Sequence, residues 1–262
     1  MIKVIVCGAS GRMGQRIINL IAQDKETQLA GAVEVKGHPA LGREIEAGLS
    51  KVKIVDDLSL VIKDADVIID FTNAESTLSN LAIVKENKKK AVIGTTGLTD
   101  EETAQVRKIS KDIACVLAPN MSMGVNLLFK LVDEAARALS DYDVEITEAH
   151  HNKKKDAPSG TAKKLAEIIE EALNRDISKD AVYGRSGVVG ERKKNEIGIH
   201  AVRAGDIVGE HTVTFASTGE RLELTHRAHS RDTFASGAVT AAKWLKAKKT
   251  GLYDMQDVLG LK

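Results

Sequence analysis

The fold is decided close to the N-terminus, where residues 2–14 read I-K-V-I-V-C-G-A-S-G-R-M-G. The apolar run 2–7 is typical of a buried strand, and the glycines that follow it predict a tight turn. In residues 16–24, R-I-I-N-L-I-A-Q-D, apolar side chains recur at the spacing of a helix that packs on a sheet. Residues 29–33, L-A-G-A-V, predict a second buried strand that ends at Glu34. This order of elements is a βαβ unit with a glycine-rich first turn.

The glycine-rich turn is the first candidate binding site. Gly8, Gly11 and Gly14 stand between the expected strand and helix, where glycine lets a pyrophosphate approach the backbone. The helix N-terminus adds partial positive charge for the phosphates. Glu34 lies 20 residues beyond Gly14, where an acid receives the hydroxyls of the adenosine ribose. We therefore predict a dinucleotide site rather than a mere turn of an α/β protein.

The choice of dinucleotide stays open at this point. Glu34 favours the free ribose diol of NAD(H) and would repel the additional phosphate of NADP(H). Arg12 and Lys36 could offset that repulsion. We expect a site that accepts NADH and is also able to use NADPH.

The alternation of strands and helices continues through the first half of the chain. Strands are expected at 65–71, 90–94 and 113–117, and helices over 77–86 and from a capped start at 99–102. This order predicts a parallel, doubly wound sheet of the Rossmann type. Ligands of such sheets bind at the carboxyl ends of the strands, so the loops there should line the nicotinamide side of the site. These loops are Asp70-Phe71-Thr72, Gly94-Thr95-Thr96-Gly97 and Ala118-Pro119-Asn120-Met121.

The pattern changes after about residue 122. An expected helix over 124–140 is followed by period-two alternation in 142–148, and a second helix is expected near 161–174. Further alternating segments, without helices between them, predict an antiparallel or mixed sheet with one covered face. They are 197–203, 209–216 and 220–227, and a last helix over about 233–246 is expected to end the regular pattern. We infer a dinucleotide-binding domain of residues 1–122 plus 231–262, and an α+β substrate-binding and oligomerisation domain of residues 123–230.

The second candidate site is residues 148–161, which read E-A-H-H-N-K-K-K-D-A-P-S-G-T. Two imidazoles and an ammonium group bring proton donors and cations together, and a Ser-Gly-Thr turn at a helix start offers backbone N–H groups to an anion. This stretch predicts a pocket that binds a small, negatively charged substrate and gives it a proton. His150 alone would more often be a structural histidine. The histidine pair has no third ligand at a suitable spacing, so no metal site is expected.

Composition excludes several classes of protein. The formal charge is +1 and aromatic residues make up 3%, which argues against a nucleic-acid-binding protein. Apolar runs are too short for a membrane span, and Cys7 and Cys115 lie in apolar runs typical of buried strand thiols. A strand begins at residue 2 with no signal peptide before it, so we expect a cytoplasmic protein.

Several motifs together resemble the 4-hydroxy-tetrahydrodipicolinate (dihydrodipicolinate) reductase family of diaminopimelate and lysine biosynthesis. They occur in the family's order and span nearly the whole chain. The most specific is E-A-H-H-x-x-K-x-D-A-P-S-G-T-A, at 148–162. The others are V-x-G-x-x-G-R-M-G at the start, D-F-T, G-T-T-G, A-P-N-M-S-M-G-V-N at 118–126 and S-R-D-T-F-A-S-G-A at 230–238.

The resemblance implies hydride transfer from NADH or NADPH to a cyclic dicarboxylate, in a homotetramer built through the sheet of the substrate domain. By position, His150 matches the family's proposed proton donor and Lys154 the second one. The candidate substrate-binding residues, from the sequence and the resemblance together, are His151, Lys154, Ser159, Gly160, Thr161 and Arg231. The candidate cofactor residues are Gly8, Ala9, Ser10, Gly11, Arg12, Met13, Glu34, Lys36, Phe71, Gly94, Thr95, Thr96, Ala118, Pro119, Asn120 and Met121.

One departure from the family bears on the cofactor. Many members have an arginine directly after the acid of the second strand, where this chain has Val35. A strong preference for NADPH is therefore not expected.

Two alternatives belong to other classes of function. A non-catalytic dinucleotide sensor would keep the glycine turn and lose the proton donors, yet this chain keeps both. A semialdehyde dehydrogenase of the aspartate pathway would need a cysteine nucleophile, which Cys7 and Cys115 do not provide from within strands.

Overall fold

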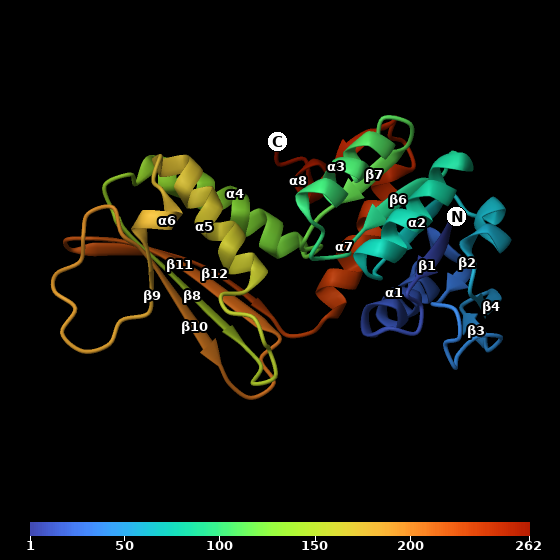
Figure 1. Cartoon of the computed structure of the whole chain (residues 1–262), viewed down its shortest axis with the longest axis horizontal. Helices are drawn as coiled ribbons and strands as arrows, with labels where there is room; N and C mark the ends of the chain where they lie inside the picture. Colours follow the sequence, from blue (N-terminus) through green and yellow to red (C-terminus); the bar gives the residue numbers. More distant parts are fainter. The chain divides into compact units, whose positions relative to one another are not determined.

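A computed structural model describes residues 1–262, and the chain divides into two compact units. Unit 1 consists of Met1–Met123 and Arg231–Lys262, and unit 2 of Gly124–Ser230. Unit 2 is thus inserted into unit 1, with the chain returning to unit 1 after residue 230 (Figure 1).

Unit 1 is built on an eight-stranded sheet with the order β13-β7-β6-β5-β1-β2-β4-β3. Neighbouring strands run parallel, except that β3 and β4 form an antiparallel hairpin at one edge. The strand order reverses beside β1, so the carboxyl end of β1 is the switch point at which such sheets bind ligands. The strands are β1 (Ile2–Cys7), β2 (Thr27–Val33), β3 (Glu44–Ala47), β4 (Ser50–Val55), β5 (Val67–Asp70), β6 (Lys90–Ile93), β7 (Ala114–Leu117) and β13 (Gly251–Tyr253).

Helices cover both faces of this sheet because its strands are apolar on both sides. Val4 and Val6 of β1 belong to a core with α1 (Arg12–Gln23) and α7 (Asp232–Leu245). The intervening side chains of β1 face a second core with α2 (Ala74–Glu86) and α3 (Asp100–Ile109). A short helix, α8 (Met255–Leu259), and two 3-10 turns, Leu58–Leu60 and Ile62–Asp64, complete the unit.

Unit 2 has a five-stranded mixed sheet with the order β12-β11-β8-β10-β9. Strand β8 is parallel to β10 and antiparallel to β11. Helices α4 (Met123–Ala138) and α5 (Gly160–Leu173) lie over one face of the sheet and form the core with it (Figure 1). The remaining elements are β8 (Asp143–His150), α6 (Ile177–Asp180), β9 (Ala181–Tyr183), β10 (Ile197–Arg203), β11 (Gly209–Ser217) and β12 (Glu220–Ala228).

The structure confirms the fold class predicted from the sequence, a Rossmann-type sheet joined to a smaller α+β sheet. The capping box expected at Thr99 and Glu102 is present, and both cysteines are buried. Burial raises the pKa of Cys115 to about 12, so this thiol is unsuited to nucleophilic attack. No helix combines the length and the apolar composition that a membrane span requires.

Two details of the expected organisation were wrong. The helix expected over 77–86 begins at Ala74, because the side chain of Asn73 accepts a hydrogen bond from Ser76 N and caps the helix there. The helix over 233–246 does not end the regular pattern, since β13 and α8 follow it. Strand β13 has only three residues, too short for a pattern of burial to be visible in the sequence.

Candidate active site

The glycine-rich turn joins β1 to α1 in unit 1. Gly8 N and Ala9 N donate hydrogen bonds to Val33 O at 2.9 and 3.1 Å, which holds the turn against the end of β2. A β-carbon on Gly14 would lie 2.1 Å from Gly8 O, so the helix can approach the turn this closely only with glycine there. The N-cap of α1, Gly11, provides no side-chain acceptor for the first turn. The N-terminus of this helix is therefore suited to bind an anionic group.

Glu34 lies directly beyond β2, beside this turn. Its Oε2 accepts a hydrogen bond from Ser10 N at 2.9 Å, and its Oε1 accepts one from Val35 N at 3.0 Å. The carboxylate is thus fixed next to the turn, as expected for an acid that receives ribose hydroxyls. Arg12 and Lys36, the two cations expected to modulate the site, are both exposed.

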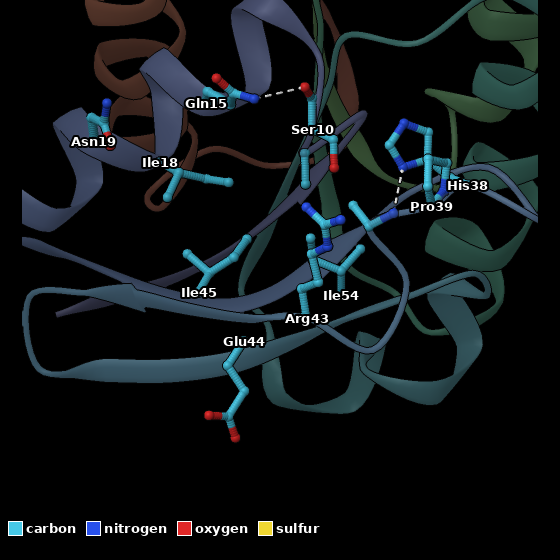
Figure 2. Close-up of a pocket in the computed structure, with 12 residues that line it drawn as sticks. Ser10, Gln15, Ile18, Asn19, His38, Pro39, Arg43, Glu44, Ile45 and Ile54 are labelled. Atoms are coloured by element: carbon cyan, nitrogen blue, oxygen red, sulfur yellow. Dashed lines mark hydrogen bonds between the residues drawn. The ribbon is translucent and has the colours of Figure 1, made fainter.

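A cavity of about 520 Å³ opens on the side of the turn that faces α1 and the β3–β4 hairpin (Figure 2). Its polar lining includes Ser10, His38 and Arg43. Arg43 extends toward the turn, whereas the carboxylate of Glu44 points away and pairs with Lys51. Nδ1 of His38 accepts a hydrogen bond from Ala40 N, so its Nε2 is the nitrogen left for a ligand. The residues lining the cavity are Ala9, Ser10, Gln15, Ile18, Asn19, His38, Pro39, Ala40, Arg43, Glu44, Ile45 and Ile54.

A buried carboxylate, Asp70, ties together two of the loops at the carboxyl edge of the sheet. Its Oδ1 accepts from the hydroxyl of Thr72 at 2.6 Å and from that of Thr77 at 3.2 Å. Thr77 and Thr95 share a further hydrogen bond of 2.7 Å. Asn80 donates to Oδ2 at 2.7 Å. Asp70 therefore fixes the loops that begin at Phe71 and Gly94 relative to one another.

The other predicted cofactor residues of unit 1 lie in different environments. Pro119 and Thr96 are exposed and Asn120 is half-buried, but Thr95 is buried with its hydroxyl bound inside the Asp70 network. Ala118 and Met121 are each 2% exposed and belong to the core of unit 1. Because their side chains are buried, Ala118 and Met121 have mainly backbone groups with which to contact a cofactor. The ring of Phe71 lies over the backbone of Gly94.

In unit 2 the central feature is Glu148, which is completely buried at the carboxyl end of β8. Arg203, its neighbour on β10, donates from Nη1 to Oε2 and from Nη2 to Oε1, both at 2.8 Å. Ser159 N donates to Oε1 at 3.0 Å, and Nδ1 of His150 lies 2.6 Å from Oε2. Burial alone would raise the pKa of Glu148, but Arg203, then His150 and Ser159, lower it below its usual value. The carboxylate is therefore ionised.

His150 lies two residues further along β8, on the same face as Glu148. Its ring makes an edge contact with His211 of β11, with centroids 5.2 Å apart and planes at 74°. Burial lowers the pKa of His150, Glu148 raises it, and the charges of Lys154 and Arg203 lower it again. The net direction is downward, which favours a ring that gives up a proton easily.

His211 supports this arrangement from the next strand. Its Nε2 lies 2.9 Å from the hydroxyl of Ser159, and its Nδ1 is buried without a partner. Burial, followed by the charge of His150, lowers the pKa of His211 to about 3. His211 is therefore neutral near pH 7.

The remaining predicted substrate residues surround the end of β8. Lys154 is mostly buried, and its ammonium group pairs with Asp156 at 2.8 Å. Nδ1 of His151 accepts from Lys153 N at 3.2 Å. Ser159 is the N-cap of α5, with Gly160 and Thr161 as the first helical residues. Arg231 belongs to unit 1, where it is the N-cap of α7.

Sequence reasoning missed three residues of these networks. No pattern near Arg203 in the sequence indicated a role. Its contact with Glu148 arises because β10 pairs with β8 in a register that places Arg203 opposite His150. His211 looked like a polar strand position, and its role follows from the pairing of β11 with β8 opposite Glu148. Asp70 stood within a loop of interest, but its burial needed the fold. Across the chain, no group of three or more His, Cys, Asp or Glu side chains is arranged to hold a metal ion.

Comparison with known proteins identifies the family. The model of the dihydrodipicolinate reductase N-terminus matches residues 2–121, and that of the C-terminus matches residues 124–259. The chain belongs to the dihydrodipicolinate reductase family. The resemblance predicted from the motifs is thereby confirmed.

Individual members of the family agree over their full length. The 4-hydroxy-tetrahydrodipicolinate reductase of Geotalea daltonii is 55% identical over 267 residues and covers 100% of both chains. That of Syntrophus aciditrophicus is 53% identical with the same coverage. A solved structure, the dipicolinate-bound dihydrodipicolinate reductase of Paenisporosarcina sp. TG-14, superposes with a TM-score of 0.80 at 27% identity and covers 98% of each chain.

Proposed function

We propose that the chain reduces 4-hydroxy-tetrahydrodipicolinate to tetrahydrodipicolinate with NADH or NADPH, as a step of lysine and diaminopimelate biosynthesis. The observation that carries the proposal is the buried Glu148–His150 pair beside Lys154, in a chain whose other unit has a glycine-rich dinucleotide turn. The full-length relatives named for this reaction support it.

The cofactor and the substrate have separate binding groups. The residues of unit 1 fit a dinucleotide, since the uncapped start of α1 suits a pyrophosphate and Glu34 suits the ribose hydroxyls. When bound, the reduced nicotinamide supplies the hydride. A substrate with two carboxylates requires cations and N–H donors, which Lys154 and the Ser159-Gly160-Thr161 turn provide in unit 2, with His151 and Arg231 as further candidates.

The proton is assigned to His150. Hydride addition to a conjugated imine leaves an enamine-like anion, which must be protonated. Nδ1 of His150 is held by the completely buried carboxylate of Glu148, and the negative charge of a bound dicarboxylate raises the pKa of His150 toward that of a charged donor. Lys154 binds a carboxylate and is the second candidate proton donor.

The alternative, a dinucleotide sensor without catalysis, is not favoured. A sensor has no need of proton donors, yet this chain retains His150, held by Glu148, and the neighbouring Lys154. Every member reported above is named as a reductase.

The finer choice of cofactor rests on charges beside the turn. Glu34 supports the use of NADH. Arg43 and His38 of the neighbouring cavity present N–H donors without an acidic partner, and they are our candidates for the additional phosphate of NADPH. We expect Glu34→Ala to weaken NADH more than NADPH, and Arg43→Gln to weaken NADPH alone. Lys51→Gln is the matched control, because Lys51 lies on the same hairpin and pairs with Glu44. Equal losses for both cofactors would refute these assignments.

A cytoplasmic homotetramer is also part of the proposal. The free cysteines suit a reducing compartment. Val202 of β10 is an exposed apolar side chain on the face of the unit 2 sheet opposite to the helix-side core residues Ile197 and Ile199, as expected of a surface that another subunit covers. Light scattering coupled to size exclusion should give four times the 28.2 kDa chain mass, and a monomer would contradict this assembly.

The reaction itself is tested by a coupled assay. A dihydrodipicolinate synthase supplied with pyruvate and aspartate semialdehyde produces the substrate in the cuvette, and absorbance then follows NADH and NADPH in separate runs. We expect oxidation of at least one cofactor that depends on both the synthase and this protein. Binding of a dinucleotide without oxidation would favour the sensor.

A further inference from the structure

Glu148 accepts a full set of hydrogen bonds. Each carboxylate oxygen has one donor from Arg203 and one other partner, Ser159 N on Oε1 and Nδ1 of His150 on Oε2. The donors come from three elements, β8, β10 and the N-cap of α5. A carboxylate held in this way cannot rotate or move without breaking several charge-assisted hydrogen bonds.

The ionised carboxylate determines how the His150 ring is protonated. An ionised carboxylate only accepts hydrogen bonds, so the 2.6 Å contact requires a proton on Nδ1 of His150. In the neutral ring Nε2 then carries no proton, and in the charged ring Nε2 carries the proton that can leave. The carboxylate of Glu148 thus determines which nitrogen of His150 can release a proton.

Nε2 is kept available by its surroundings. The hydrogen bond of His150 is made through Nδ1, and Nε2 hydrogen-bonds to no protein group. It faces the backbone of Gly209, where a β-carbon would lie 3.1 Å away. His211 packs against the ring at right angles and is itself anchored on Ser159.

We propose that Glu148 is the positioning residue of this reductase, which fixes the ring of His150 and commits Nε2 to proton delivery, with Arg203 as the counter-charge. The inference rests on the proposed function for its kinetic consequences. In the step, the N–H bond of Nε2 breaks, its electron pair stays on the imidazole, and the proton joins the anion left by hydride transfer. Nδ1 keeps its proton throughout.

Arg203 explains why Glu148 does not take the proton itself. The charged groups around His150 are Glu148 on the same strand, Arg203 on β10, and Lys154 with Asp156 in the following loop, with neutral His211 on β11. Hydrogen bonds from Arg203, His150 and Ser159 N keep the pKa of Glu148 below its usual value, so the proton between Glu148 and His150 stays on Nδ1 of the imidazole.

The direct test replaces the charge and keeps the shape. In Glu148→Gln we expect kcat to fall on the order of 10- to 100-fold, the size of effect found when the hydrogen-bond partner of a metal-bound histidine is removed, with the KM for substrate and the affinity for NADH nearly unchanged. Because Glu148 raises the pKa of His150, its loss should move the basic limb of the kcat–pH profile to lower pH. Glu148→Asp should restore the position of that limb while recovering only part of kcat.

The matched control lies on the other face of the same strand. Glu145 also binds a histidine, His200 at 2.7 Å, and an arginine, Arg185 at 2.9 Å. Glu145→Gln should therefore leave kcat and the pH profile as they are. Equal effects of Glu145→Gln and Glu148→Gln would overturn the proposal, since both would then act through the stability of the sheet.

Two measurements keep the proposal testable if Glu148→Gln fails to fold. Gly209→Ala leaves the network intact but presses a methyl group on Nε2, and should lower kcat with normal thermal stability. In the unmodified protein, ¹⁵N-histidine NMR, with His150 assigned from His150→Gln, should show the Nδ1–H tautomer at alkaline pH. The Nε2–H tautomer would overturn the proposal whether or not the coupled assay detects reduction, so its failure is distinct from that of the proposed function.

Discussion

Strand β8 carries two clusters of the same composition on its opposite faces. On one face Glu148 binds His150 and Arg203, and on the other Glu145 binds His200 and Arg185. Glu148 is completely buried, whereas the side chain of Glu145 is 27% exposed. A set of residue types is therefore not enough to define a site.

The difference lies in what surrounds each histidine. His150 has a mostly buried lysine nearby, a second histidine against its ring and a free Nε2. His200 uses its Nε2 to bind Glu145, and Arg185 and Arg192 both pair with that carboxylate. Arg185 and Arg192 also connect Glu145 to Glu196 and Asp143, in a network that joins the 185–196 loop to the sheet. We therefore interpret the Glu148 cluster (the inner cluster) as catalytic and the Glu145 cluster (the outer cluster) as structural.

The largest expected effect separates the two histidines. His150→Gln should lower kcat by about 10²- to 10⁴-fold, the usual contribution of a general acid, with the affinity for NADH nearly unchanged. His200→Gln should leave kcat close to that of the wild type. Steady-state kinetics in the coupled assay and NADH titration measure both quantities. Weak NADH binding by His150→Gln would contradict the role given to this residue.

A second prediction separates two adjacent lysines. Lys154 is mostly buried beside His150, whereas Lys153 is exposed. Lys154→Ala should raise the KM for substrate and lower kcat, for a combined loss in kcat/KM of about 10- to 100-fold, as for a lost hydrogen bond to a charged group. Lys153→Ala should stay within a factor of about two, since a lone exposed charge contributes little. Normal kinetics for Lys154→Ala would remove this residue from the site.

A third prediction uses the depressed pKa of His211. Its pKa falls from 6.5 to about 3 in the folded chain, so the unfolded chain binds more protons between these values. Stability should therefore decrease as pH falls from about 6.5 toward 3, and His211→Gln should flatten this dependence. Urea unfolding at pH 7 and pH 5 measures it. The same difference between the two pH values in wild type and variant would refute the neutral, buried state of His211.

The smallest expected effect belongs to the outer cluster. Burial would raise the pKa of Glu145, but Arg185, His200 and Arg192 lower it to about 2. The ion pairs therefore stabilise the fold above about pH 4.5 and lose this contribution as pH falls toward 2. Glu145→Gln should lower the thermal midpoint by a few degrees at pH 7, and the difference should shrink in acid. A constant difference from pH 7 to pH 3 would contradict this account.

The sequence predicted those parts of the molecule that depend on local pattern. The βαβ start, the role of Glu34 as a neighbour of the turn and the block 148–161 all follow from residues close together in the chain. Arg203 and His211 could not be found in this way, because Arg203 binds Glu148, 55 residues earlier, His211 binds Ser159, 52 residues earlier, and both contacts depend on strand register. Asp70 shows the same limit, since its acceptor role depends on helix α2 and strand β6 returning to it.

The short strands at the sheet edges were not predicted from the sequence, for a different reason. Strands β3, β9 and β13 have three or four residues each and are exposed or half-buried at most positions, so they lack the continuous buried run of the equally short β5, β6 and β7. Their place is set by pairing with longer neighbours, which the sequence of each segment does not encode by itself.

The central claim is that His150, and not His200, faces the bound dicarboxylate as a charged proton donor. Histidine NMR of the ¹⁵N-labelled protein at a pH where His150 is neutral, with and without saturating dipicolinate, tests it most directly. We expect Nε2 of His150 to become protonated when the dianion binds, with Nδ1 still protonated and the His200 signals unchanged. If dipicolinate saturates the protein and the His150 signals do not move, the account is contradicted.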